Sequence, residues 1–215
     1  MYLVERPHLQ VALDMLDFDL ALAVAFQVED YVDLIEAGTP LIKYNGLNAL
    51  RLLKQHFANK PVVADLKIMD AADLEVSMAS SVGADVVTVM AAAPADTIYI
   101  AIRRAHACGI RVIVDLLGVA DVVAKAQELK AMAPDFLLLH IGLDQQRQRV
   151  SPVDGIEALA RATDLSLGIA GGIQVGDISR LLAIRNLDLI VVGAAITSAV
   201  HPGEAAREFR EALNR

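Results

Sequence analysis

Residues 83–107 read GADVVTVMAAAPADTIYIAIRRAHA and contain one complete copy of the pattern that decides the fold. A short run rich in valine, residues 85–89, starts two residues after Gly83 and leads into a longer helical pattern, residues 95–107. A strand that begins at once after a helix-stop residue and is followed by a helix is the βα unit of parallel sheets. We therefore predict that this stretch is one member of a series of βα units.

The same unit recurs along the whole chain. The predicted strands are residues 9–13, 31–35, 61–64, 85–89, 111–114, 135–139, 165–170 and 189–192. The predicted helices are residues 19–28, 46–56, 71–81, 95–107, 121–132, 153–161, 175–183 and 203–214.

The number of units distinguishes two α/β architectures. Eight βα units close a barrel, whereas an open doubly wound sheet would carry a glycine-rich fingerprint in its first βα turn, which residues 14–19 lack. No linker or low-complexity segment interrupts the series. We predict an α/β fold with one domain, residues 1–215, forming a single (β/α)8 TIM barrel near the minimum of about 200 residues.

The composition limits the classes of function. A formal net charge of −8 argues against nucleic-acid and anionic-membrane partners, because both attract basic surfaces. Cys108 is the only cysteine, which excludes an intrachain disulfide. No stretch reaches the roughly 18 apolar residues of a membrane span, and the N-terminus does not resemble a signal peptide. We expect a cytoplasmic protein that binds a small molecule.

Three carboxylates stand at the ends of three successive predicted strands: Asp14, Glu36 and Asp65. In such barrels the chemistry lies at the carboxyl ends of the strands, so these side chains are expected to converge. Any one of them alone would more often be a helix N-cap or a solvated loop residue. Three together require neutralisation, which Lys67 and an oxygen-ligated divalent cation such as Mg²⁺ would supply.

Asp65-x-Lys67-x-x-Asp70 is the most specific local signal, because residues two apart in a strand share a face. Asp70 lies past the strand, so the spacing does not place it at the same site. His140 directly follows the apolar run 136–139 and stands at the same rim. Both a structural role and a proton-transfer role are open for His140.

Glycines follow the last two predicted strands. Barrel enzymes often hold a phosphate between these two loops, where backbone N–H groups face the ligand. Gly171 and Gly172 after the seventh strand, with Gly193 and Ala194 after the eighth, match that position. The alternative is that both loops are tight turns that need glycine for conformation.

Several blocks, in order from about residue 9 to the C-terminus, resemble the 3-hexulose-6-phosphate synthase family. The blocks are VALD (11–14), IEAGTPLIK (35–43), ADLKIMDA (64–71), GADVVTV (83–89), AGGI (170–173) and VG (192–193). The resemblance extends to a superfamily that also contains 3-keto-L-gulonate-6-phosphate decarboxylase and orotidine 5′-phosphate decarboxylase, which share the Asp-x-Lys-x-x-Asp element.

The resemblance implies a lyase that condenses D-ribulose 5-phosphate with formaldehyde, reversibly, through a metal-stabilised enediolate. It implies that Glu36 and Asp65 ligate Mg²⁺, for which Mn²⁺ can substitute, with Asp14 close by. It also implies a homodimer with shared active sites, in which Asp70 is donated to the partner's site. Lys67 would hydrogen-bond the substrate and the carboxylates, and His140 is the candidate for proton transfer.

Three alternatives stay open: a 3-keto-L-gulonate-6-phosphate decarboxylase, an aldolase acting on another phosphorylated ketose, and a non-catalytic sugar-phosphate-binding protein. A resemblance to the decarboxylases would require a His-Arg-x-Arg-Asp run after the sixth strand. Residues 140–146 read HIGLDQQ instead, which is closer to the synthase pattern. The chain departs from the synthase pattern at 44–46, 91–93 and 147–150, loops that contact or cover the substrate. Those departures leave the substrate's identity open.

Overall fold

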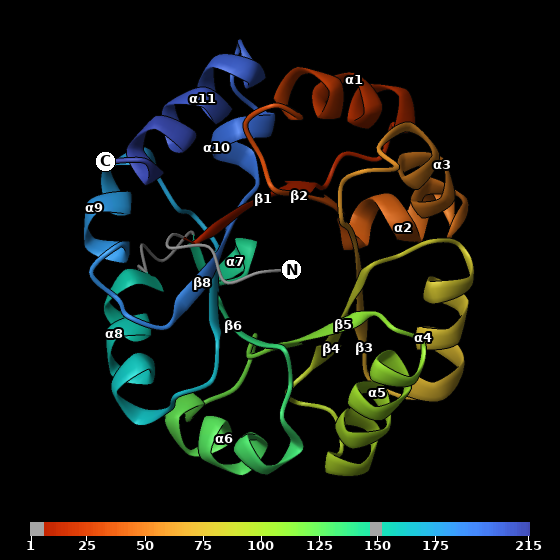
Figure 1. Cartoon of the computed structure of the whole chain (residues 1–215), viewed down its shortest axis with the longest axis vertical. Helices are drawn as coiled ribbons and strands as arrows, with labels where there is room; N and C mark the ends of the chain where they lie inside the picture. The colour runs from red at the N-terminus through yellow and green to blue at the C-terminus, as the bar shows by residue number, and fades with distance from the viewer. Residues whose placement is uncertain (1–6, 147–151) are drawn as a thin grey trace.

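A computed structural model describes residues 7–146 and 152–215. Eight strands of the described chain close into a parallel barrel in sequence order, with β1 paired to both β2 and β8. Most of the helices form a ring around the strands, while the short α7 is seen inside that ring (Figure 1). The structure is therefore the (β/α)8 barrel that the series of βα units predicts.

The strands are short and apolar. Their bounds are β1 His8–Leu13, β2 Leu34–Ala37, β3 Val62–Ile68, β4 Val86–Met90, β5 Arg111–Asp115, β6 Phe136–His140, β7 Leu167–Ala170 and β8 Leu187–Val192. The pairing of β3 with β4 shifts register between Ala64 and Ile68. This irregularity lies at the carboxyl end of β3, beside the predicted acidic residues.

The helices follow the strands, and several are shorter or more divided than the sequence predicts. Their bounds are α1 Phe18–Val28, α2 Thr39–Asn45, α3 Asn48–His56, α4 Ala72–Ser81, α5 Ala95–Ala107, α6 Val122–Leu129, α7 Leu143–Gln146, α8 Pro152–Ala162, α9 Ile178–Leu181, α10 Ala194–Thr197 and α11 Pro202–Leu213. Two 3-10 turns, Lys130–Met132 and Val175–Asp177, complete the series. No helix of residues 7–146 and 152–215 is long and apolar enough to cross a membrane.

Several predicted boundaries differ from the observed ones, and two of them are instructive. The second strand was expected at 31–35 but runs over Leu34–Ala37, because its register follows the pairing with the strands on either side. The helix expected at 46–56 is preceded by the separate helix α2, which has a proline in its first turn and ends at Gly46 with φ 67°.

The core has two layers. One large cluster packs the outward side chains of the strands against the helices. A second, smaller cluster fills the inside of the barrel; its members are Ala12, Leu34, Val63, Val86, Ile113, Phe136, Leu138, Ala170, Leu189 and Val191. Because side chains alternate along a strand, this inner cluster determines which residues point into the mouth of the barrel.

Candidate active site

Beyond the inner cluster, the next inward-facing position of each strand is occupied by a polar residue or a glycine. Two residues beyond members of the inner cluster stand Asp14, Glu36, Asp65, Thr88, Asp115, His140, Gly172 and Gly193. The period of two along each strand therefore directs these positions to one mouth, at the carboxyl ends of the strands. The predicted convergence follows from the same alternation that builds the core.

Asp65 is the most heavily hydrogen-bonded carboxylate of the mouth. Its Oδ2 accepts from Thr39 Oγ1 at 2.7 Å and from Lys67 Nζ at 2.5 Å, while its Oδ1 accepts from Thr88 Oγ1 at 2.8 Å. Burial alone would raise the pKa of Asp65, but the Lys67 charge and these hydrogen bonds outweigh it and lower the pKa. Asp65 is therefore held ionised and in one orientation.

The pKa values of Glu36 and Asp14 are shifted in the opposite direction, upward. Burial, then the charges of Asp65 and Asp14, raise the pKa of Glu36 well above its usual value. Gln10 Nε2 donates to Glu36 Oε2 at 2.6 Å and partly opposes that rise. Asp14 is exposed on one side at the mouth, yet partial burial and the Asp65 charge raise its pKa too. The three carboxylates are close enough to repel one another, as predicted.

Lys67 lies at the centre of the negative charge. Besides contacting Asp65, its Nζ is 3.9 Å from Asp115 Oδ2. Burial would lower the pKa of Lys67, but the charges of Asp65, Asp115 and Glu36 raise it. The side chain is thus held as an ammonium, which suits it to donate hydrogen bonds and makes it a poor proton acceptor.

His140 is paired with a carboxylate that the sequence analysis did not assign to the site. Its Nδ1 is 2.8 Å from Oδ2 of Asp115, a residue only 1% exposed on β5. Asp115 Oδ1 also accepts from the Leu117 N–H at 2.8 Å. An ionised carboxylate only accepts, so this contact assigns the proton of neutral His140 to Nδ1 and leaves Nε2 to face a ligand.

Asp70 is not brought to this site. It is exposed beyond the end of β3, and within residues 7–146 and 152–215 no hydrogen bond or ion pair joins it to Asp65 or Lys67. Its charge acts instead on Glu75 of α4, whose pKa burial and Asp70 raise. The spacing rule that links Asp65 to Lys67 therefore does not extend to Asp70 within one chain.

The glycines of the last two loops differ in why glycine is needed. Gly171 has φ 102°, and a Cβ there would lie 2.1 Å from the Ile141 carbonyl oxygen, so the turn itself requires glycine. Gly193 has no such constraint, since a Cβ would meet nothing closer than Asp14 Oδ2 at 3.7 Å. Gly193 is followed by α10, whose first residue, Ala194, is exposed. The first N–H groups of that helix have no intrahelical acceptor.

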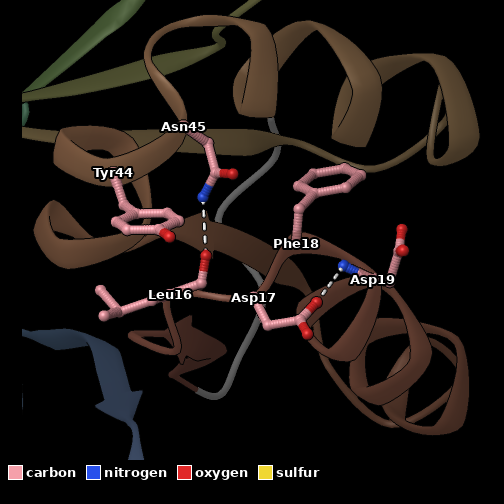
Figure 2. Close-up of a pocket in the computed structure, with 6 residues that line it drawn as sticks. All are labelled: Leu16, Asp17, Phe18, Asp19, Tyr44 and Asn45. Carbon is pink, nitrogen blue, oxygen red and sulfur yellow. Dashed lines mark hydrogen bonds between the residues drawn. The ribbon is translucent and has the colours of Figure 1, made fainter.

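A separate open cavity of about 430 Å³ lies at the rim. Figure 2 shows its lining residues, Leu16, Asp17, Phe18, Asp19, Tyr44 and Asn45. Asn45 Nδ2 donates to the Leu16 carbonyl at 2.8 Å and so ties α2 to the first βα loop. Two of the residues where the chain departs from the synthase pattern thus line this rim, while the departure at 147–150 lies outside the described residues.

The carboxylates at the mouth fit a divalent cation. A carboxylate has about four lone-pair positions; Asp65 uses three in the hydrogen bonds above, which leaves one on Oδ1. Within residues 7–146 and 152–215 no three His, Cys, Asp or Glu side chains form a ready-made metal site. Mg²⁺ commonly takes only one or two carboxylates, with waters and substrate oxygens as further ligands, so a three-residue site is not required for Glu36 and Asp65 to be its ligands.

Carboxylates, a half-buried lysine and a carboxylate-bound histidine at the mouth of a small barrel are the groups that a barrel enzyme places at its active site. The model of the orotidine 5′-phosphate decarboxylase / HUMPS family matches residues 7–209. This chain therefore belongs to the orotidine 5′-phosphate decarboxylase / HUMPS family. The match confirms the resemblance seen in the sequence, and with it the expectation of an enzyme of the lyase class.

Individual relatives agree with the family. A 3-hexulose-6-phosphate synthase of Staphylococcus haemolyticus is 40% identical over 206 residues, which cover 95% of this chain and 98% of the relative. A crystal structure of a 3-hexulose-6-phosphate synthase has a TM-score of 0.90 and 39% identity, covering 96% of this chain and 99% of that chain. The 3-keto-L-gulonate-6-phosphate decarboxylase of Vibrio cholerae has a TM-score of 0.87 and 28% identity, covering 98% of both chains.

Proposed function

We propose that this chain is a Mg²⁺-dependent aldolase that condenses D-ribulose 5-phosphate with formaldehyde to 3-hexulose 6-phosphate, reversibly, through a 1,2-enediolate. The observation that carries the proposal is the mouth of the barrel. There Lys67 bridges Asp65 and the Asp115–His140 pair, in a chain whose relatives include proteins that carry the synthase name. The cytoplasm is the proposed compartment, in keeping with the single cysteine.

Glu36 and Asp65 are the residues that would hold Mg²⁺, or Mn²⁺ in its place. When bound, the ion would act as a Lewis acid toward the oxygens of the ketose. Lys67 contributes independently of the ion, because its ammonium can donate to an oxygen on which negative charge develops. Thr39 and Thr88 keep Asp65 oriented while that charge forms.

His140 is the proposed proton-transfer residue. Its free Nε2 takes the proton from C1 of ribulose 5-phosphate, and the electron pair of the C1–H bond becomes the enediolate. C1 then bonds to the formaldehyde carbon, and the formaldehyde oxygen takes up the proton to become a hydroxyl group. Asp115 holds the ring with Nδ1 protonated and stabilises the imidazolium that exists between these two steps.

The phosphate of the substrate is assigned to the loops after β7 and β8. Gly171 and Gly172 shape the first loop, and the backbone N–H groups at Gly193 and Ala194 begin α10 after the neighbouring strand β8. Backbone donors need no basic side chain, which reconciles an anionic substrate with a net charge of −8.

The proposed assembly is a homodimer with shared active sites. Asp70 is exposed away from its own mouth, and beside it Met69 is 48% exposed while Leu74 and Met78 of α4 are 60% and 43% exposed. Exposed apolar side chains on either side of Asp70 in the sequence suit burial against a second copy, with Asp70 reaching the partner's site. Mixing inactive Asp70→Ala and Asp65→Ala proteins should then restore activity, because mixed dimers regain one intact site.

The residues after His140 favour the aldolase over the decarboxylase. A decarboxylase must place cationic groups near the substrate carboxylate, but Ile141, Gly142 and Leu143 follow His140 here. Among the described residues of the mouth, Lys67 is the cation held by ion pairs.

The direct test incubates the purified protein with Mg²⁺, ribulose 5-phosphate and formaldehyde and follows formaldehyde loss. Loss that disappears with EDTA and in Asp65→Ala supports the aldolase and its strand 3 carboxylate together. A well-folded protein that consumes no formaldehyde, yet releases CO₂ from 3-keto-L-gulonate 6-phosphate, would replace the synthase with the decarboxylase.

A further inference from the structure

The hydroxyl of Thr88, on β4, contacts both Asp65 and Lys67 of β3. Its side chain is buried, at 3% exposure, and faces the inside of the barrel. The hydroxyl donates to Asp65 Oδ1 at 2.8 Å and accepts from the backbone N–H of Lys67 at 2.9 Å. Thr39 also donates to Asp65, but only Thr88 contacts both residues.

The backbone of Lys67 is in a conformation that rarely suits a side chain. Its φ is 50°, in the left-handed region. The cause is the register shift between β3 and β4: Ala64 pairs with Val87 and Ile68 with Val89, so β3 carries two extra residues. At such an irregularity a ladder N–H loses its carbonyl acceptor, and here the Thr88 hydroxyl takes the place of that carbonyl.

The side chain of this left-handed residue lies between two carboxylates. Lys67 Nζ reaches back to Asp65 Oδ2 at 2.5 Å and lies 3.9 Å from Asp115 Oδ2. Strained conformations persist only where the surroundings hold them in place, and Thr88 supplies that constraint on the backbone side.

We propose that Thr88 is a positioning residue whose hydroxyl holds Lys67 in its left-handed conformation and Asp65 in its orientation, so that the ammonium lies at the reacting oxygens. This role rests on the proposed function, since it concerns the same mouth and the same lysine. Thr88 contributes no proton to the reaction; it acts only through Lys67 and Asp65.

Thr88→Val tests the proposal, because valine keeps the shape and removes both hydrogen bonds. We expect kcat to fall about 100-fold, the loss that a misplacement of about 1 Å can cause, with KM changed much less. Thr88→Ser retains the hydroxyl and should recover at least a tenth of the wild-type kcat. Thr97→Val is the matched control: Thr97 is also buried, at 9% exposure, but lies on α5, and among the described residues no hydrogen bond joins it to Asp65 or Lys67.

A second readout does not depend on the substrate. Acylation of lysines, followed by mass spectrometry, reports how firmly the Lys67 ammonium is held, with exposed Lys43 as the internal reference. Thr88→Val should raise the rate at Lys67 several-fold over wild type, while Thr88→Ser and Thr97→Val should leave it unchanged. Should Thr88→Val fail to fold, Thr88→Ala compared with Thr88→Ser gives the same contrast.

The outcomes separate the two proposals. A Thr88→Val protein with wild-type kcat, or with wild-type reactivity at Lys67, overturns the positioning role. Wild-type protein that consumes no formaldehyde overturns the proposed function alone, because the Lys67 reactivity still decides whether Thr88 holds the lysine. A crystal structure of Thr88→Val in which Lys67 keeps its left-handed φ would also contradict the role.

Discussion

Gly38 offers a sharp test of how closely the mouth of the barrel is packed. Its φ is −66°, a value that any residue can adopt, so conformation does not require glycine there. Space does: a Cβ on Gly38 would lie 2.1 Å from Asp14 Oδ1 and 2.7 Å from the Leu13 carbonyl oxygen. Gly38→Ala should therefore destabilise the protein and displace Asp14.

The magnitude follows from these two contacts. Ordinary contact begins near 3.4 Å, so the Asp14 carboxylate must retreat by the difference, about 1.3 Å, while the Leu13 carbonyl is backbone and yields little. Overpacking of this kind costs about 1–3 kcal/mol. For a chain of this size each kcal/mol lowers Tm by about 2–4 °C, so the expected loss is roughly 2–12 °C. A displaced Asp14 should also lower kcat by up to about 100-fold.

Urea denaturation and thermal unfolding measure the first effect, and formaldehyde consumption measures the second. Gly176→Ala is the control, since a Cβ there would meet nothing within 4 Å, and it should change stability by less than about 0.5 kcal/mol. The double variant Gly38→Ala, Asp14→Ala should be less destabilised than the sum of the two single changes, because the alanine no longer clashes with a carboxylate. Additive effects, or a Gly38→Ala protein as stable as the control, would refute the packing argument.

Three further predictions follow from the same contacts. Glu36→Gln should raise the free energy of unfolding at pH 7 in EDTA, because the raised pKa of Glu36 means that its ionised form destabilises the folded state. That gain in unfolding free energy should vanish below about pH 4, where the carboxyl is protonated in both the folded and the unfolded state, and a gain that persists there would contradict this origin. At pH 7, Mg²⁺ should reduce the difference between the variant and the wild type, because the ion stabilises the wild type alone. Asp115→Asn should lower kcat about 100- to 10,000-fold with little loss of stability, since the amide can donate to His140 Nδ1 and select the wrong tautomer; an unchanged pH–rate profile would count against the pair. Leu137→Ala, at a fully buried position of the outer core, should cost about 2–5 kcal/mol in urea denaturation, and a smaller loss would mean that the site collapses around the cavity.

Much of the fold could be predicted because it depends on local alternation. The pattern of β-branched runs and helical segments identified eight βα units, and the structure confirms their closure into a barrel. Boundaries were less predictable where pairing with neighbours decides the register. The strand expected at 31–35 shifted to Leu34–Ala37, and β3 extended to Ile68 through an irregularity that only its pairing with β4 creates.

The candidate site likewise has one part that the sequence predicts and another part that it does not. The rule that strand ends carry chemistry located Asp14, Glu36, Asp65, Lys67 and His140 from the chain alone, and the structure brings these residues to one mouth. Their roles, the metal, the phosphate loops and the donation of Asp70 stay predictions. Site residues at strand ends can be predicted from the sequence because side chains alternate between the two faces of a strand, and this alternation is a property of each strand by itself.

Only the tertiary structure revealed the residues that hold the predicted site residues in place. Gln10, Thr88 and Asp115 matter through hydrogen bonds to residues 26, 23 and 25 positions away in the sequence. A glutamine, a threonine or an aspartate inside an apolar strand has no local pattern that names its partner. The partner is set by how neighbouring strands are staggered when the barrel closes, and that stagger is a property of the whole sheet, which no single segment carries.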